Sequence, residues 1–265
     1  MKLVFVGSGN TATVLAKKFF AAGHTILQVW SRTREHARQL AAVTQAQPVD
    51  ELSDISSNAD LVLVAVADQA LPALSTQLKL GAVPVVHTAG SVSGDVLQGS
   101  STNYGVLYPL QSLRKEMDPM SEIPFLINAA TPQLMQQLQH LALTVSSQVQ
   151  QANDAQRLSF HCAAVLVNNF TNHLYALANQ FCNERQVDFQ LLLPLIRETA
   201  LRLQHASPEQ LQTGPALRKD EATIQRHLDL LAANQPLQQL YSILTESIFA
   251  MYAKNEELRN TNSPL

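Results

Sequence analysis

From residue 2 to residue 12 the chain reads KLVFVGSGNTA, an apolar run that ends at two closely spaced glycines. The run has the composition of a buried strand, and residues 11–22 have the apolar spacing of an amphipathic helix. A second apolar run follows from Thr25 to Trp30. Gly7 permits a tight turn, and Gly9 leaves the backbone open to a bound phosphate. Strand, glycine turn, helix and strand in this order predict a dinucleotide-binding βαβ unit.

The glycine turn has two interpretations. Glycine serves the backbone conformation alone in many βα turns, whereas in a dinucleotide site the N-terminus of the following helix faces the pyrophosphate. We favour the second, because every part of the pattern appears in order. The expected cofactor contacts come from the glycine turn and from the end of a later apolar run, residues 61–66. They are Gly7, Ser8, Gly9, Asn10, Thr11, Ala65, Val66 and Ala67.

The end of the second predicted strand indicates which dinucleotide binds. NAD-binding proteins usually carry an acidic residue there for the ribose 2′-hydroxyl, but this chain has Ser31, Arg32 and Thr33. A hydroxyl beside a guanidinium suits a 2′-phosphate, because arginine donates paired hydrogen bonds to phosphate oxygens. The sequence therefore predicts NADP as the cofactor, held in part by these three residues. The alternative is that Arg32 and Arg34 are solvated charges at a helix start.

The first half of the chain alternates apolar runs with helical patterns. This alternation predicts an α/β fold of the Rossmann type, a doubly wound parallel sheet with helices on both faces. We place this domain at residues 1–152. Its expected strands are residues 2–6, 25–30, 61–66, 83–87, 104–107, 124–128 and 147–152, and its expected helices are residues 11–22, 33–43, 68–78 and 131–143.

The second half contains helical patterns only, so we expect an all-α domain at residues 153–265. Asn153 or Asp154 is expected to cap a long helix that runs to about Cys182. Ser207-Pro208 has the composition of a cap followed by proline at the first helical position. The other expected helices are residues 188–205, 220–233 and 236–258, before a tail from Asn260 that we expect to fray.

The composition argues against several partners. Eighteen Lys and Arg residues against 21 Asp and Glu residues lack the basic excess of nucleic-acid-binding proteins. No apolar run approaches the ~20 residues that span a bilayer, and the first run is too short for a signal peptide, so we expect a cytoplasmic protein with no membrane partner.

Cys162 and Cys182 would lie about 30 Å apart on one helix and are not expected to pair. No metal-ligand motif is present, so we expect no metal site.

Two loops fall at the carboxyl ends of expected strands, where open α/β sheets bind ligands. The loop HTAGS offers Gly90 and Ser91, and the loop YPLQS offers Tyr108 and the rigid Pro109. We take these four residues as candidates for substrate binding. The alternative is ordinary turn chemistry, in which glycine, serine and proline are common.

A polar stripe lies on the long helix expected after residue 153. His161, Asn168 and Asn172 fall within roughly 40° of one another on an α-helix, among apolar neighbours that make unpaired polar groups costly to bury. His161 is the expected proton donor or acceptor and Asn168 the group that orients the substrate, so these two are the catalytic candidates. Asn172 is a candidate for substrate binding. The alternative is an interior histidine with satisfied hydrogen bonds, and asparagines that bridge helices or subunits.

Residues 213–220 combine a turn with two cations and an acid. Arg218 is the expected contact for an anionic part of the substrate. In the alternative, Asp220 caps the following helix while Arg218 and Lys219 lie in solvent.

These motifs together resemble a family of NADP oxidoreductase-like proteins, in which a Rossmann domain precedes a helical domain of unknown function, number 2520. The resemblance covers nearly the whole chain. It rests on GSGN at residues 7–10, HTAGS at 87–91, YPLQS at 108–112, HCAA at 161–164 with NNF at 168–170, and the segment from Thr213-Gly214-Pro215 to His227-Leu228.

The wider superfamily that the chain resembles includes pyrroline-5-carboxylate reductases, prephenate dehydrogenases and 6-phosphogluconate or β-hydroxyacid dehydrogenases. The resemblance implies hydride transfer in a cleft between two domains, and a homodimer formed through a helical domain like that of 6-phosphogluconate dehydrogenase. β-Hydroxyacid dehydrogenases carry a lysine where this chain has Ala164 or Val165, and prephenate dehydrogenases carry a histidine where it has Tyr108. This chain therefore has neither of these acid/base groups, and His161 is the remaining candidate for that role.

We therefore expect an NADP(H)-dependent oxidoreductase that transfers a hydride to or from a small carbonyl, imine or hydroxyacid substrate. One alternative is a sensor or regulatory protein that binds NADP(H) without chemistry, which the missing lysine favours. Another is an enzyme like pyrroline-5-carboxylate reductase. A nicotinamide that faces a substrate-sized pocket near His161 would distinguish an enzyme from a sensor.

Overall fold

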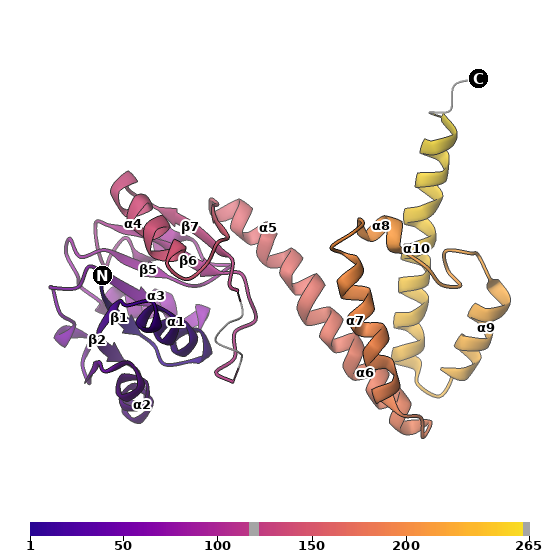
Figure 1. Cartoon of the computed structure of the whole chain (residues 1–265), viewed down its shortest axis with the longest axis horizontal. Coiled ribbons are helices and arrows are strands. Elements are labelled where there is room, and N and C mark those ends of the chain that lie inside the picture. Colours follow the sequence, from indigo (N-terminus) through magenta and orange to yellow (C-terminus); the bar gives the residue numbers. More distant parts are fainter. Residues whose placement is uncertain (117–121, 262–265) are drawn as a thin grey trace. The chain divides into compact units, whose positions relative to one another are not determined.

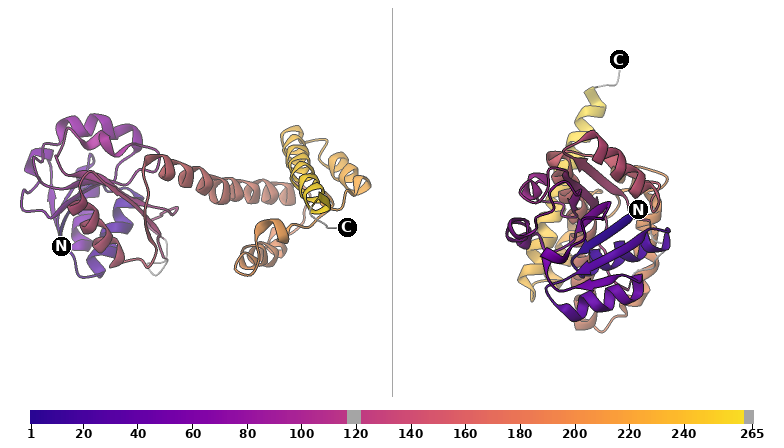
Figure 2. Two further views of the ribbon diagram at one scale, coloured as in Figure 1. Left: turned by 90° about the horizontal axis from the view of Figure 1, so that it is seen from above. Right: turned by 90° about the vertical axis from the view of Figure 1, so that its left-hand side faces the viewer.

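The computed structural model describes residues 1–116 and 122–261 of the 265-residue chain. The chain divides into two compact units, Met1–Thr171 and Asn172–Leu265. Figures 1 and 2 show the elements of each unit. All the strands of the described residues belong to the first unit, and the described part of the second unit holds helices and loops.

The first unit is built on one eight-stranded sheet in the order β3-β2-β1-β4-β5-β6-β7-β8. Strands β1 to β6 are parallel, β7 is antiparallel to β6, and β8 is parallel to β7. This order reverses direction beside β1, as in a Rossmann fold, and confirms the predicted fold class. The strands are β1 (Lys2–Val6), β2 (Thr25–Trp30), β3 (Gln47–Val49), β4 (Leu61–Val64), β5 (Val85–His87), β6 (Tyr104–Pro109), β7 (Phe125–Ala129) and β8 (Val149–Gln151).

Two strands differ from the expectation in their presence or in their extent at the site, and the bounds of β4, β5, β7 and β8 differ by one or two residues. β3 was not predicted, because three residues that include Pro48 give no strand pattern, and proline is tolerated there only at the sheet edge. β6 continues past residue 107, because Tyr108 and Pro109 pair with residues of β7. Tyr108 and Pro109 therefore form the end of a strand rather than a loop, which fixes their backbone.

Each face of the sheet carries its own apolar core, because neighbouring residues of a strand point to opposite sides. In β1, Leu3 and Phe5 belong to one core, and Val4 and Val6 belong to the other. Helices therefore cover both faces and hold the strand ends in place. α1 (Asn10–Ala21), α2 (Arg34–Thr44) and α4 (Pro132–Leu143) pack on the first core, and α3 (Leu71–Gln77) with the short helix η3 (Gly94–Leu97) packs on the second.

Helix α5 (Asp154–Ala164) follows the last strand. Asn153 caps it, because the Asn153 side chain accepts the N–H of Gln156 while the Gln156 side chain accepts the N–H of Asn153. Beyond α5 the chain forms a π-helical turn, η4 (Val165–Phe170), and then α6 (Thr171–Glu184). The single regular helix expected here is thus interrupted, and the wider turn changes which side chains share a face.

The second unit bears out two predicted caps. Ser207 caps α8 with Pro208 at the first helical position, and Asp220 caps α9 by accepting the N–H of Thr223 at 3.0 Å. Of the tail expected to fray, Asn260 and the residue after it belong to α10, and residues 262–265 lie outside the described residues. Besides α6, the helices are η5 (Phe189–Leu192), α7 (Leu193–Arg202), α8 (Pro208–Leu211), α9 (Glu221–Leu230) and α10 (Gln235–Thr261).

The expectations about the two cysteines and about membrane-spanning helices can be compared with the described residues. Cys162 is exposed and Cys182 is buried, and both are free thiols. Within residues 1–116 and 122–261, none of the helices has the length and hydropathy that crossing a membrane requires.

Candidate functional site

Three loops at the carboxyl ends of β1, β2 and β4 line a pocket of about 490 Å³, a volume typical of ligand and cofactor sites. All the residues predicted to bind the dinucleotide line it, at positions 7–11, 31–33 and 65–67. The lining also includes Trp30 and His36, which the sequence analysis did not single out. His36 lies on the first turn of α2, and its position three residues after Thr33 was the available signal.

Gly7 occupies a position that excludes any side chain. Its φ is +124°, and a Cβ built on it would lie 2.2 Å from the carbonyl oxygen of Ala65. Its N–H donates a hydrogen bond of 2.8 Å to the carbonyl of Trp30. Glycine therefore lets the ends of β1, β2 and β4 converge on one pocket.

The N-terminus of α1 supplies the anion-binding part of this pocket. Gly9 is the N-cap residue, and no atom lies within 4 Å of the position that its Cβ would take. The first turn of α1 carries no acidic residue. Its free N–H groups and the positive end of the helix dipole therefore suit a pyrophosphate.

The two arginines after β2 have different surroundings. Arg34 pairs with Asp50 at 3.3 Å and with Glu51 at 3.7 Å, whereas Arg32 forms no ion pair with any described residue. Ser31 lies beside the glycine turn, with its Oγ 2.7 Å from the Oγ of Ser8. Arg32 lines the pocket with an uncompensated charge, which fits a 2′-phosphate.

Strands β1, β4, β5 and β6 are parallel neighbours in the sheet, so their carboxyl ends share one edge. The glycine turn follows β1, and Ala65 follows β4. The loop with Gly90 and Ser91 follows β5, and Tyr108 lies near the end of β6. The predicted cofactor and substrate residues thus lie along one edge in the order of the strands.

The loop after β5 is held by the buried side chain of His87. The His87 Nδ1 accepts the N–H of Ala89 at 3.1 Å, and its Nε2–H donates to the carbonyl of Ser93 at 3.1 Å. Burial is the main cause that lowers the pKa of His87 to about 4, so the ring is neutral. Ser91 donates to the carboxylate of Asp68 at 2.8 Å, which ties the loop to the segment after β4.

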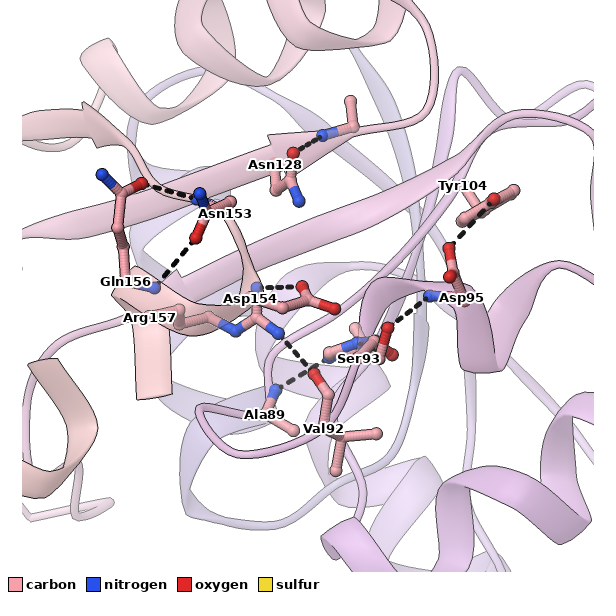
Figure 3. A network of polar contacts seen from close by, with 12 residues as sticks. Ala89, Val92, Ser93, Asp95, Tyr104, Asn128, Asn153, Asp154, Gln156 and Arg157 are labelled. Carbon is pink, nitrogen blue, oxygen red and sulfur yellow. Dashed lines mark hydrogen bonds and ion pairs between the residues drawn. The ribbon is translucent and has the colours of Figure 1, made fainter. Parts of the chain in front are cut away.

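The same loop is bound from the other side by Arg157 of α5, which is 1% exposed (Figure 3). Its Nη2 donates to the carbonyl of Val92, and its Nη1 lies 2.9 Å from a carboxylate oxygen of Asp154. Positions 157 and 161 are one helical turn apart, so they lie on the same side of α5. Arg157 therefore sets where His161 meets the loop, and sequence analysis missed it because the spacing alone does not reveal its burial.

His161 and Tyr108 form a hydrogen-bonded pair. The Tyr108 Oη lies 3.0 Å from the His161 Nδ1, and the rings meet edge to face with centroids 5.9 Å apart. Gly90 lies directly against them, because its Cβ would be 2.7 Å from Nδ1. Burial raises the pKa of Tyr108, and the charge of Asp68 adds to this effect. Tyr108 is therefore a neutral phenol that keeps its hydroxyl proton.

This pair lines a second pocket of about 410 Å³ together with residues of the π-helical turn. Asn168 and Asn169 both line it, with apolar side chains such as Phe160. Asn168 and Asn169 are consecutive residues of this π-helical turn. Asn169 was quoted in the sequence motif but not predicted as a site residue.

The remaining candidates lie elsewhere. Pro109 ends β6 next to Tyr108. Asn172 and Arg218 belong to the second unit, and their roles stay predictions. Within the described ranges, no group of three or more His, Cys, Asp or Glu side chains is placed to hold a metal ion.

Comparison with known proteins identifies the family. Residues 2–89 match the family described as NADP oxidoreductase, coenzyme F420-dependent, and residues 123–248 match the domain of unknown function DUF2520. A candidate NADP oxidoreductase from Bacteroides fragilis is 40% identical over 94% of this chain and 98% of that one, with a TM-score of 0.86. The chain belongs to this family of NADP oxidoreductases. NADP is accordingly its dinucleotide, as the segment after β2 predicts.

More distant structures share the fold of this NADP oxidoreductase. An imine reductase from Myxococcus stipitatus in complex with NADP⁺ is 16% identical, covers 97% of this chain and 95% of its own, and has a TM-score of 0.59. A 1-pyrroline-5-carboxylate reductase from Streptococcus pyogenes is 13% identical over 94% and 98%, with a TM-score of 0.65. No functionally curated protein gave a significant match.

We expect Arg157→Met to destabilise the first unit by roughly 2 kcal/mol, because it leaves the carbonyl of Val92 and the partly exposed carboxylate of Asp154 without their partner. The fluorescence of Trp30, the single tryptophan of the chain, reports urea unfolding of that unit. Arg34→Met is the matched control. Arg34 forms exposed ion pairs with Asp50 and Glu51 in the same unit, so a loss above about 1 kcal/mol there, or none at Arg157, would contradict the assignment.

His87 predicts a loss of stability in acid. The unfolded chain binds a proton at this imidazole near pH 6.5, while the folded chain binds it only near pH 4. The free energy of unfolding therefore falls as the pH drops through this interval, by about 3 kcal/mol at most. Urea titrations at several pH values should show a shallower fall for His87→Gln than for the wild type. His140→Gln, at an exposed histidine of α4, should leave the fall unchanged.

Proposed function

We propose that this NADP oxidoreductase transfers a hydride between the nicotinamide of NADP(H) and a small carbonyl, imine or hydroxyacid substrate. The observation that carries the proposal is the hydrogen-bonded pair of Tyr108 and His161, which lines a substrate-sized pocket in the unit that also holds the dinucleotide pocket. NADPH supplies the hydride when it is bound. The chain must supply the proton, and this pair is a suitable source.

Each predicted residue has a role in this proposal. His161 supplies or accepts the proton, and Asn168 orients the reacting group through its amide. Substrate contacts come from Gly90, Ser91, Tyr108 and Pro109 at the strand ends, and from Asn172 and Arg218 of the second unit. The lining of the pocket supports the assignment, because its hydrogen-bonding side chains stand among apolar ones.

The domain organisation is part of the proposal. We assign residues 1–152 to NADP binding and residues 153–265 to substrate contacts and to a homodimer interface. Leu158, Leu166, Val167 and Phe170 are more than half exposed. Large apolar side chains gathered on one helical segment favour a protein partner, and a second copy of the chain is the partner we propose. The balance of 18 Lys and Arg residues against 21 Asp and Glu residues supports the absence of nucleic-acid partners, and a cytoplasmic location is also part of the proposal.

A second candidate function is an NADP(H)-binding sensor. Ala164 and Val165 line the pocket where related β-hydroxyacid dehydrogenases place their lysine, which favours a protein without chemistry. A third candidate is reduction of pyrroline-5-carboxylate, supported by the fold shared with the Streptococcus pyogenes enzyme. Incubation with NADPH and a panel of small ketones, cyclic imines and pyrroline-5-carboxylate separates the three. NADPH binding without turnover of any compound would favour the sensor.

We expect Arg32→Glu to weaken NADPH binding by about 100-fold and NADH binding by only a few-fold. It removes charge-assisted hydrogen bonds and places a carboxylate near the 2′-phosphate. Calorimetric titration with both dinucleotides measures the difference. Arg38→Glu makes the same charge change on the exposed face of α2, outside the pocket, and should leave both affinities nearly unchanged. Equal losses for NADPH and NADH would contradict the role of Arg32.

We expect His161→Ala to lower turnover by about 10²- to 10⁴-fold, the usual cost of removing a general acid, with NADPH affinity nearly intact. NADPH absorbance follows turnover on whichever compound of the panel the wild type reduces, and calorimetry gives the affinity. His140→Ala is the control. Turnover that survives the loss of His161 would remove it from the mechanism.

A further inference from the structure

The proton source in the second pocket has two parts rather than one. We propose that Tyr108 is a catalytic residue that donates the proton to the substrate, and that His161 then reprotonates Tyr108. This inference rests on the proposed function, in which His161 alone was assigned the proton. The structural basis is the 3.0 Å contact between Tyr108 Oη and His161 Nδ1 at the pocket wall.

The hydrogen bond permits transfer from His161 to Tyr108. Nδ1 is the imidazole nitrogen that Tyr108 contacts, so when Nδ1 carries a proton, that proton points at the phenol oxygen. The hydroxyl hydrogen of Tyr108 is then free to turn toward a group in the pocket. Tyr108 comes from β6, which is next to β5 in the sheet, and so lies at the edge of the sheet where the ligand-binding loops begin.

Gly90 brings the pair against the loop after β5. A Cβ at position 90 would lie 2.7 Å from His161 Nδ1 and 2.9 Å from Tyr108 Cζ, so any larger residue would displace both rings. The loop is itself fixed by His87 and by Arg157, one helical turn before His161. Arg157 is thus a positioning residue, which acts on the reaction only through the place of His161.

The proposed step balances for reduction of a carbonyl or imine. The hydride from NADPH forms a new C–H bond, and the electron pair of the C=O or C=N bond moves to the heteroatom. That atom takes the hydroxyl proton of Tyr108, and Tyr108 takes the Nδ1 proton of His161, which enters the step as the imidazolium. NADP⁺, a reduced substrate and neutral His161 result, and solvent returns a proton to the imidazole. In the oxidative direction the same protons move in reverse.

A double-mutant cycle tests the series arrangement. We expect Tyr108→Phe to lower turnover by about 10²- to 10⁴-fold, with NADPH affinity unchanged. The Tyr108→Phe/His161→Ala double variant should be no slower than Tyr108→Phe alone, because the loss of the Tyr108 hydroxyl already blocks proton transfer from His161. Tyr104→Phe removes a phenol hydroxyl four residues before Tyr108 on β6, where it contacts Asp95 outside this pocket, and should keep wild-type turnover.

Other outcomes overturn the relay. If His161 delivers the proton directly, Tyr108→Phe costs less than about 10-fold, and if the two groups act independently, their losses multiply in the double variant. Gly90→Ala gives a second measurement, since it should lower turnover while NADPH affinity is retained, and unchanged turnover would contradict the contact. If the wild-type protein binds NADPH but reduces no compound of the panel, both the proposed function and the relay are wrong. If the wild-type protein and the Tyr108→Phe variant are both active, the relay alone is wrong.

Discussion

The buried guanidinium of Arg157 is the interaction on which the arrangement of the site depends. An arginine with 1% exposure is costly unless its charge and its N–H groups find partners. Its Nη2 donates to the carbonyl of Val92 and its Nη1 pairs with the carboxylate of Asp154, which joins the first turn of α5 to the loop after β5, while its Nε has no hydrogen-bond partner among the described residues. His161 follows on the same side of the helix, and its place against Gly90 is a consequence of that anchor.

The neutral ring of His87 is the second half of the same constraint. A protonated His87 would bring another cation near Arg157 and lose the acceptor that holds the N–H of Ala89. Burial keeps the imidazole uncharged, and both of its nitrogens are then used within one loop. The loop is thereby held by hydrogen bonds from β5, from Asp68 and from α5, which leaves little freedom for Gly90 to move away from the pair. Rigid support of this kind is what a proton donor needs if it is to meet a substrate at a fixed distance.

The sequence predicted those parts of the fold and site that local pattern encodes. Glycine spacing, the absence of an acid after β2 and the apolar runs were sufficient for the Rossmann fold and for NADP. The π-helical turn, by contrast, has no pattern of its own in the sequence. The pair of Tyr108 and His161 joins residues 53 positions apart, and the anchor of Arg157 joins residues 65 apart. Such contacts depend on how β6, the loop after β5 and α5 pack together, which residue spacing does not express.

These contacts change the interpretation of one difference from β-hydroxyacid dehydrogenases, the absence of their lysine from this chain. The positions that correspond to it, Ala164 and Val165, are small or apolar and line the pocket without offering a proton. His161 lies about one turn earlier on the same helix and reaches the pocket from there, in contact with a phenol from the sheet. A lysine ammonium has an ordinary pKa of about 10.4 and becomes a stronger acid only when it is desolvated, whereas an imidazole has an ordinary pKa of about 6.5 and exchanges protons readily near neutral pH. The absence of this lysine is therefore compatible with the acid/base chemistry that we propose, in which Arg157 holds the helix against the loop after β5.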